Sequence, residues 1–581
     1  MSRGLGDVYK RQNKSFVYII IAILCVAMSA CLDDDNNYNY DKLNELQGGY
    51  QSIGGLKDDY SIAVDEKLTL TPTFKFTIDS IAPDVSYEWY LDGQLLADEQ
   101  GPSYTFSSSK SGTARITFAV IDNKSGVKFA RSTTVKIRTE FQRGWAILSR
   151  GNDNRSILNF IIPSTVTYFT TIDGNEEARD SLVYHRVKMD VTPNLGMNPI
   201  GLMENLGNMD YYSSLGLEVY DELLVKQDKW AELNGNTLEH ELYTFEEFNN
   251  DLPDNFSPVE AAMTYSAKLL RNENGHIFLN NKIDAGDFHA GFYTSVPLNN
   301  GMKFRRLFQS LKINDLYCSV IPALKEDNTL VGIYDGGITV SDYSTTISEN
   351  STKLTGNVYE ITEMNDQKHF QKMSQEVVDM IPAASARKND YDVSAAVPAW
   401  VALMKEPGSN SYGLRYFALE GKDGGGVATI SETEYFEKEL GVIPSYKDIA
   451  VFNNKMFVVI ADGNRLWYCQ YGQDPETGTN HNEAMLLLGE MTSDIVSLAV
   501  NDLSASPYMP SYNGQLGVAL ADGTFSIYEV KETKNQATGV CEEVTLGKLF
   551  PNEVIEDNHF GNVVDALYKL GRGFDYFWFE F

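Results

Sequence analysis

The sequence predicts a mainly β protein, in which an N-terminal β-sandwich precedes a larger β-propeller-like domain of about seven blades with helical insertions. Two patterns predict this fold. Short alternating segments separated by turn residues fill positions 48–140, as is typical of a sandwich. Apolar hairpins with polar turns then recur through 141–581, as is typical of a propeller. The 33 Tyr and 29 Phe residues also favour strands.

The first 30 residues predict a secretory signal peptide. Basic residues precede an apolar stretch at 16–30, which ends in small residues, and this order is typical of such signals. The stretch is short for a membrane-spanning helix, which needs about 20 apolar residues, and three aspartates follow at 33–35. The opening segment MSRGLGDVYKRQ resembles a translated adapter and is left out of the fold prediction.

Cys31 follows the small residues Ser29 and Ala30, and this junction resembles the lipobox of bacterial lipoproteins. The resemblance implies that Cys31 becomes the first mature residue and carries the lipid. A chain held by acyl groups is anchored to a membrane without spanning it. The polar, acidic residues at 31–47 then predict a tether without periodic structure. The acidic run resembles an export signal for the outer face of the outer membrane, so we expect the protein to face the cell exterior.

The charge balance excludes one class of partner. Residues 1–30 carry four basic and one acidic side chain, so the remainder has 44 basic and 79 acidic residues, a net charge of −35. Such a surface repels nucleic acid. Three cysteines follow Cys31 at widely separated positions, which predicts buried thiols and no disulfide framework.

The region 48–140 predicts a small sandwich from five alternating segments. One of them, YEWYLDG, places Trp89 in mid-strand before an Asp92-Gly93 turn, so we expect Trp89 to pack between the sheets. Together with the later ITFAVIDNKSG segment, it resembles PKD-type domains. With the lipobox, the first ~140 residues resemble the PKD-like lipoprotein family of Bacteroidota. That resemblance implies a partnership with SusC/SusD-type outer-membrane uptake systems.

The region 141–581 predicts a closed ring of similar sheets. Related hairpins are expected at 144–163, 330–343, 414–431, 456–472 and 516–530. The last two align at Asp462-Gly463 and Asp522-Gly523, which are 60 residues apart, and Asp-Gly between apolar runs is a strong hairpin signal. This spacing favours seven blades. We expect the final segment, 574–581, to pair with the strand near Trp145 and so close the ring.

Three segments of this region have helical spacing, at 210–234, 245–270 and 365–388, and predict insertions between strands. Insertions of this kind often carry binding residues. Trp230 and Trp400 lie in the less regular segments. We name these two tryptophans as candidates for stacking against a sugar or peptide ligand.

The sequence contains none of the strong catalytic motifs, such as GxSxG, HExxH, a P-loop or a dinucleotide fingerprint. We therefore name no catalytic residue, no metal site and no cofactor. His276 and His289 flank Asp284 and Asp287 and could ligate a metal, but an incidental surface hairpin is the preferred interpretation.

Three functions compete at this stage. The first is a non-catalytic surface lipoprotein that binds an oligosaccharide or peptide as an accessory subunit of a SusC/SusD-like uptake system. The second is a propeller hydrolase, such as a glycosidase, which requires carboxylates that converge in the central funnel. The third is a structural adaptor, which requires a broad exposed apolar patch.

Overall fold

The computed structural model describes residues 44–569 with internal gaps. The gaps are 49–51, 79–80, 173–174, 206–221, 249–250, 255, 265–266, 282–290, 311–319, 337, 342–343, 348–353, 385–397, 425, 454, 475–476 and 503–513. The predicted signal peptide, Cys31 and the final segment 574–581 lie outside the described residues. Within the described part of the chain, no helix has both the length and the apolar character needed to cross a membrane.

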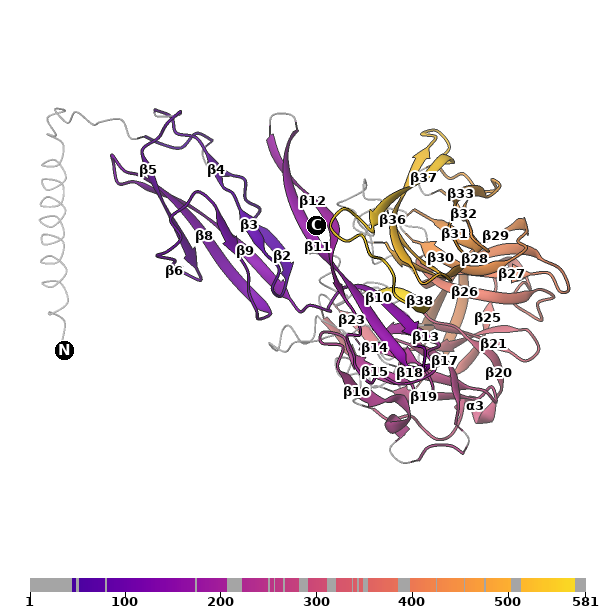
Figure 1. Cartoon of the computed structure of the whole chain (residues 1–581). Helices are drawn as coiled ribbons and strands as arrows, with labels where there is room; N and C mark the ends of the chain where they lie inside the picture. Colours follow the sequence, from indigo (N-terminus) through magenta and orange to yellow (C-terminus); the bar gives the residue numbers. More distant parts are fainter. Residues whose placement is uncertain are drawn as a thin grey trace, which may run out of the picture.

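The N-terminal region forms a sandwich of short strands (Figure 1). A five-stranded sheet with the order β2-β9-β8-β5-β6 faces the pairs β3-β7 and β1-β4. The strands are β1 (Ile53–Gly54), β2 (Asp59–Ala63), β3 (Leu68–Leu70), β4 (Thr73–Phe74), β5 (Val85–Leu91), β6 (Gln94–Leu95), β7 (Tyr104–Phe106), β8 (Gly112–Asp122) and β9 (Lys128–Arg138).

Trp89 lies at the centre of the sandwich, as the sequence predicts. Its side chain is fully buried, and its ring centroid lies 4.9 Å from that of Phe118 on β8. The indole N–H donates to the carbonyl of Gly101 over 2.9 Å, so the one polar atom of this side chain is satisfied. The Asp92-Gly93 turn has positive φ at both residues, as a type I′ hairpin requires.

The rest of the chain folds into seven consecutive antiparallel units, counted over the described strands. Unit 1 contains β38 (Asn562–Lys569), β10 (Gly144–Arg150), β11 (Ser156–Ile172) and β12 (Asn175–Lys188); unit 2 contains β13 (Gly201–Asn205), β14 (Glu222–Lys226), β15 (Ala231–Asn234) and β16 (His240–Tyr243); unit 3 contains β17 (Pro258–Met263), β18 (Ala267–Asn272) and β19 (Ile277–Asn281). Unit 4 contains β20 (Phe304–Leu307), β21 (Val320–Lys325), β22 (Leu330–Tyr334) and β25 (Val358–Thr362); unit 5 contains β26 (Glu376–Ala384), β27 (Pro398–Lys405), β28 (Ser411–Asp423) and β29 (Ala428–Val442). Unit 6 contains β30 (Tyr446–Phe452), β31 (Phe457–Asp462), β32 (Arg465–Gln470) and β33 (Leu486–Glu490); unit 7 contains β34 (Ile495–Asn501), β35 (Gln515–Leu520), β36 (Phe525–Lys534) and β37 (Cys541–Phe550).

Seven hydrophobic cores join these units into a closed ring. Each core lies between two successive sheets, and the last joins unit 7 to unit 1. The first strands of neighbouring units contact one another, as β38 does with both β13 and β34. A propeller-like ring in which every sheet packs on both faces explains why the strands are so apolar. Units 4 and 5 also share an edge, because β25 pairs with β29.

The C-terminal part of the chain closes the ring, but through a different segment from the one predicted. β38 pairs with β10 from Gly144↔Lys569 to Arg150↔Asn562. The closing strand is therefore 562–569, whereas the predicted segment 574–581 lies outside the described residues. Closure of this kind removes the unpaired edge that β10 would otherwise present at the centre.

The aligned Asp-Gly turns occupy equivalent places in units 6 and 7. Gly463 joins β31 to β32 and Gly523 joins β35 to β36, and both have positive φ. The predicted hairpin at 330–343 is wrong, because β22 pairs with β25 and not with the segment that follows it. That segment forms a separate hairpin of β23 (Ile338–Ser341) and β24 (Ser344–Ile347).

The predicted helical insertions are also wrong for the described residues. The three segments contain β14, β15, β17, β18 and β26, with only short 3-10 turns η2 (Thr244–Phe248) and η3 (Met364–Asp366). The described α-helical segment α3 (Leu298–Gly301) has four residues. In β26 a bulge between Val377 and Asp379 shifts the register, so Val377 and Met380 share one core. The three-residue spacing of these two buried side chains therefore resembles the spacing expected in a helix.

The two regions meet where β9 ends and β10 begins. The Arg138 guanidinium donates to the carbonyl of Pro163 on β11 over 3.3 Å, and Ala63 joins the core between units 1 and 2. In Figure 1 the long β11–β12 hairpin extends past the ring on the side of the sandwich.

Candidate functional site

A repeated β-bulge places polar side chains at the centre of the ring. In six of the seven described innermost strands, the register with the second strand shifts by one residue at the same place. A polar residue follows each shift. We call this set the inner ring: Glu260, Arg306, Asp379, Asp448, Ser497 and Asp565. Bulges re-aim a side chain without ending the strand, so the same device recurs around the axis.

Each member of the inner ring reaches the next unit. Asp565 accepts from the backbone N–H of Leu202 at 2.8 Å, and Asp448 accepts from that of Leu498 at 2.6 Å. The remaining links are Glu260 with the Leu307 N–H, Arg306 with the Val378 carbonyl, Asp379 with the Tyr446 hydroxyl and Ser497 with the Ala566 N–H. The inner ring therefore joins units 3 to 7, 7 to 1 and 1 to 2.

The inner-ring carboxylates have no oxygen left without a hydrogen bond. Both oxygens of Asp448 accept backbone N–H groups, those of Ile449 and Leu498, and the oxygens of Glu260, Asp379 and Asp565 are likewise engaged. Burial, reinforced by two neighbouring inner-ring carboxylates, raises the pKa of Asp448 to about 7. A glycosidase needs one carboxyl group to protonate the leaving group and another to attack or activate water. The inner ring instead uses its carboxyl groups to hold strands together.

A second buried polar cluster joins units 2 and 3. Lys268 on β18 lies 2.6 Å from Glu232, 2.9 Å from Glu247 and 3.3 Å from Glu222, and all four side chains are buried. Burial opposes the charge on Lys268, but the three carboxylates together raise its pKa. Burial and the charge of Glu222 raise the pKa of Glu232. We call these residues the Lys268 cluster.

The two candidate tryptophans lie in the core and do not offer an exposed ring. Trp400 is fully buried, stacks on Phe417 with ring centroids 5.9 Å apart and donates to the carbonyl of Gln309. Trp230 is 3% exposed and belongs to the core between units 2 and 3. The expected stacking role is wrong, because the sheets on both sides cover these rings.

The other residues considered from the sequence lie partly outside the described chain. Cys31, His289, Asp284 and Asp287 are not described, whereas His276 precedes β19. No group of three or more His, Cys, Asp or Glu side chains that could hold a metal ion occurs among the described residues. The described thiols, Cys469 and Cys541, are buried and free, as the cysteine spacing predicts.

A crevice of about 380 Å³ opens on unit 5. We call it the Arg415 crevice, and its lining residues are Gln375, Met404, Gly413, Leu414, Arg415, Glu437, Lys438 and Glu439. Arg415 and Glu437 are register partners on β28 and β29, so their side chains emerge side by side. Gly413 lies two residues before Arg415 on the same face and has no side chain to fill the space.

Partly buried groups behind the crevice fix the positions of Arg415 and Glu437. His369 Nε2 lies 2.7 Å from Glu432 Oε1, and the His369 ring stacks on Tyr435 with centroids 3.8 Å apart. Arg415 donates to the carbonyl of His369, and the Tyr435 hydroxyl donates to Glu437 over 2.6 Å. Burial raises the pKa of Tyr435, so it keeps the proton that it donates.

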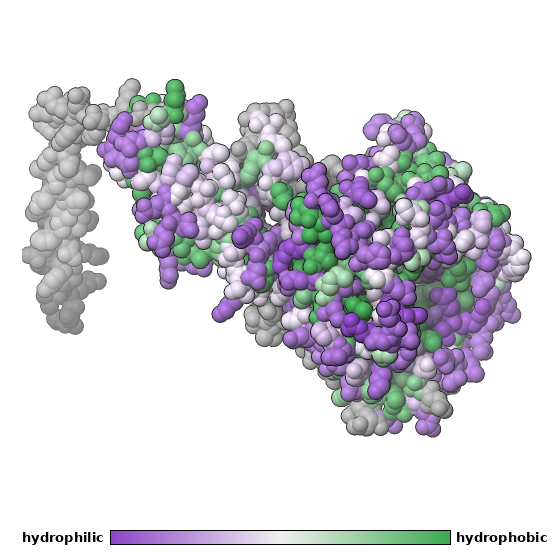
Figure 2. All heavy atoms as spheres, viewed as in Figure 1, coloured by the Kyte–Doolittle hydropathy of each residue, from purple (hydrophilic) through white to green (hydrophobic). Residues whose placement is uncertain are grey.

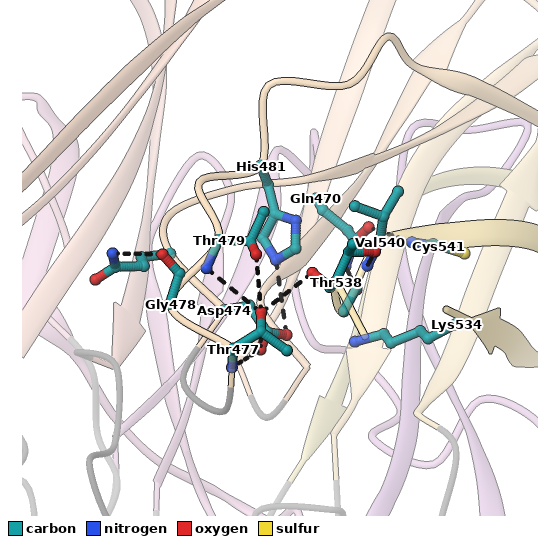
Figure 3. A network of polar contacts seen from close by, with 12 residues as sticks. Gln470, Asp474, Thr477, Gly478, Thr479, His481, Lys534, Thr538, Val540 and Cys541 are labelled. Carbon is teal, nitrogen blue, oxygen red and sulfur yellow. Dashed lines mark hydrogen bonds and ion pairs between the residues drawn. The ribbon is translucent and has the colours of Figure 1, made fainter. Parts of the chain in front are cut away.

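A third polar network joins the outer parts of units 6 and 7 (Figure 3). Asp474 accepts from the backbone N–H and hydroxyl of Thr477, and Thr477 donates to the carbonyl of Thr538 near β37. His481 is 2% exposed, and its Nε2 lies 3.9 Å from Asp474 Oδ2. Burial lowers the pKa of His481, so the neutral ring is favoured and the network is a structural contact.

The surface shown in Figure 2 is largely hydrophilic, and hydrophobic residues form separate patches on it. A structural adaptor requires one broad apolar patch. The face in view presents separate patches and not one broad patch.

Sequence reasoning missed the inner ring, the Lys268 cluster and the Arg415 crevice. The inner ring does leave a signal in the sequence. Asp448 and Ser497 each come directly after an apolar or basic residue that has no partner on the second strand, because that residue lies at the bulge. The crevice has none, because its residues come from the loop before β26 and from β27, β28 and β29.

The comparison with family models supports the PKD-like part of the N-terminal prediction. The model of the PKD-like family matches residues 31–185. This match begins at Cys31 and continues past the sandwich into β12 of unit 1. No curated protein matches the sequence.

Solved structures similar to the chain have low sequence identity. A quinonprotein alcohol dehydrogenase-like protein from Bacteroides thetaiotaomicron is 10% identical, with 87% of this chain and 97% of that chain covered and a TM-score of 0.30. A putative 6-phosphogluconolactonase from Bacteroides uniformis is 10% identical, with 73% and 99% covered and a TM-score of 0.34. Prp20p from Saccharomyces cerevisiae is 11% identical, with 73% and 90% covered and a TM-score of 0.34. The chain combines a PKD-like region, matched by the family model, with a propeller-like region. The sheet order and the cores between the sheets support the propeller-like assignment.

Proposed function

We propose that this protein is a lipid-anchored outer-membrane protein that faces the cell exterior and binds an oligosaccharide or peptide. In this proposal the PKD-like region is a spacer, and the ring of seven units is the binding part. It acts without catalysis, as an accessory subunit of a SusC/SusD-like uptake system.

The engagement of the inner-ring carboxylates is the observation that carries the non-catalytic part of the proposal. Asp565, for example, accepts from Leu202, Ser497 and Ala566. A carboxyl group held by three donors, two of them on neighbouring strands, is poorly placed to exchange protons with a substrate. The Arg415 crevice, in contrast, offers charged groups with fixed positions beside an open volume, which is what a binding site needs.

Lipid attachment is tested with the full-length chain in a lipoprotein-processing bacterium. Cys31→Ser removes the proposed acylated thiol, so we expect loss of fatty-acid labelling and of membrane retention. Cys25→Ser, within the apolar stretch, is the matched control and retains both. Equal labelling of the natural chain and Cys31→Ser would contradict the anchor.

Ligand binding is tested with the detergent-solubilised full chain on glycan and peptide arrays, together with co-purification from the outer membrane. We expect binding on one of the arrays and recovery of a SusC/SusD-like pair. The absence of both would contradict the proposed function. Release of reducing ends from a bound glycan would favour the hydrolase instead.

A further inference from the structure

The Arg415 crevice presents charges of both signs within a small space. Arg415 Nε lies 3.7 Å from Glu437 Oε2, and a Cβ placed on Gly413 would lie 3.8 Å from the Glu439 carboxylate. Lys438 alternates to the opposite face, where its amine donates to the carbonyl of Gln470 in unit 6. The charged groups on the open side are therefore one guanidinium and two carboxylates.

The guanidinium is held in place and is still accessible. Arg415 donates to the His369 carbonyl, the Met373 sulfur and the Gln375 side chain, and its side chain is 17% exposed, against 62% for Glu437. A guanidinium has five N–H donors, so these contacts leave donors available at the crevice. Preorganised donors and acceptors lose little entropy when a ligand binds.

This set of groups discriminates between classes of ligand. An anion would face Glu437 and Glu439, and a cation would face Arg415, so each would meet a like charge. An apolar ligand would desolvate these groups without replacing their hydrogen bonds, which is costly. A hydroxyl group both accepts and donates, so it can take a hydrogen bond from Arg415 and give one to a carboxylate.

We propose that the Arg415 crevice binds a neutral oligosaccharide, with two adjacent hydroxyl groups of one sugar ring held between Arg415 and Glu437. The crevice volume of about 380 Å³ lies at the lower end of small-molecule sites, which suits one or two sugar rings. This inference rests on the proposed binding function and assigns its site and ligand class.

The test uses the detergent-solubilised full chain and three probe sets: neutral hexose oligosaccharides, oligogalacturonides and chitosan oligomers. We expect binding to a neutral oligosaccharide alone. Glu437→Gln should weaken that binding about tenfold or more, because a hydrogen bond to a charged group is lost. Glu543→Gln, which removes an exposed carboxylate from the outer strand of unit 7, is the matched control and should bind as the natural chain does.

Gly413→Val is the second variant, because it fills the crevice without a charge change. Its φ does not require glycine, and the nearest atom to a new Cβ is 3.4 Å away, so the variant should fold with an unchanged melting temperature. We expect it to abolish binding. Retained binding in folded Gly413→Val would overturn the site assignment and leave the proposed function standing. Binding only to the acidic or the amino-sugar probes would overturn the ligand class. The absence of binding to these probes and to the glycan and peptide arrays would overturn the proposed function itself.

Discussion

The sandwich and the ring are both built from antiparallel strands, but different groups hold their sheets together. In the described sandwich, hydrophobic side chains form the core around Trp89, and ion pairs such as Lys128–Glu88 lie at the surface. In the ring, apolar cores between the sheets are accompanied by buried charges in the Lys268 cluster. The inner ring adds polar links at the centre.

The difference follows from the geometry that each region must maintain. Two sheets of a sandwich need only to face each other, and apolar burial has no preferred direction. A ring of seven sheets closes only if each keeps its angle to the next. Hydrogen bonds are directional, so an inner-ring carboxylate that takes the N–H of the next strand fixes that angle. The ring therefore depends on polar groups where the sandwich does not.

The largest expected effect comes from Trp89→Ala, which removes the centre of the sandwich core. We expect a loss of about 3–5 kcal/mol in the free energy of unfolding of the sandwich. Hydrogen exchange followed by mass spectrometry reports each region separately, which suits a chain of two regions. Exchange should increase in 53–138 and stay unchanged in units 3 to 6. Equal acceleration in the ring would show that the two regions unfold as one.

Lys268→Met should affect the ring to a similar degree and spare the sandwich. The variant leaves three buried carboxylates without their cation, and breaking a buried ion pair costs about 3–5 kcal/mol. Hydrogen exchange should increase in units 2 and 3. Lys303→Met, at an exposed lysine near β20, is the control and should leave exchange unchanged. Normal exchange in Lys268→Met would mean that the three carboxyl groups are protonated in the natural chain.

The sequence predicts the sandwich better than the ring because its structural signals are local. Trp89 alternates with its neighbours, and the Asp92-Gly93 turn marks the next strand, so pattern and structure agree. In the ring the bulges break the alternation, as between Val377 and Asp379, and strands buried on both faces lose it altogether. A short apolar run then does not distinguish a strand from a helix. The count of seven could be predicted because the Asp-Gly turns keep their spacing.

The candidate site could not be predicted because its residues are distant in the sequence. Lys268 meets carboxylates at 222, 232 and 247, and nothing marks these three among the 80 acidic residues of the chain. Trp230 and Trp400 were conspicuous by residue type, but large aromatic side chains are usually buried. Arg415 and Glu437 become neighbours only through the pairing of β28 with β29.

Asp565→Ala should have a smaller and more local effect than either core variant. The side chain accepts from Leu202 and Ser497, which belong to the units on either side of the ring closure. Unsatisfied buried donors cost about 1–3 kcal/mol. We expect faster exchange at the Leu202 amide and in units 1, 2 and 7. Asp565→Asn keeps one acceptor oxygen and should recover part of the protection, whereas equal losses in both variants would show that the charge matters more than the links.

The last expected effect depends on pH and concerns Asp448. Its pKa is about 7 in the folded chain, because of burial, against an ordinary value of 3.8. The folded state therefore holds a proton that the unfolded state releases, and the stability of the ring falls as the pH rises from about 4 to 7, by at most about 1.4 kcal/mol per pH unit. The raised pKa values of Asp379 and Asp565 act in the same direction. Asp448→Asn has no such proton to lose, so its melting temperature should fall less than that of the natural chain between about pH 5 and about pH 8. A variant that loses stability as steeply as the natural chain would show that Asp448 is ionised across this range, and that the inner ring tolerates its charges as the sandwich tolerates those on its surface.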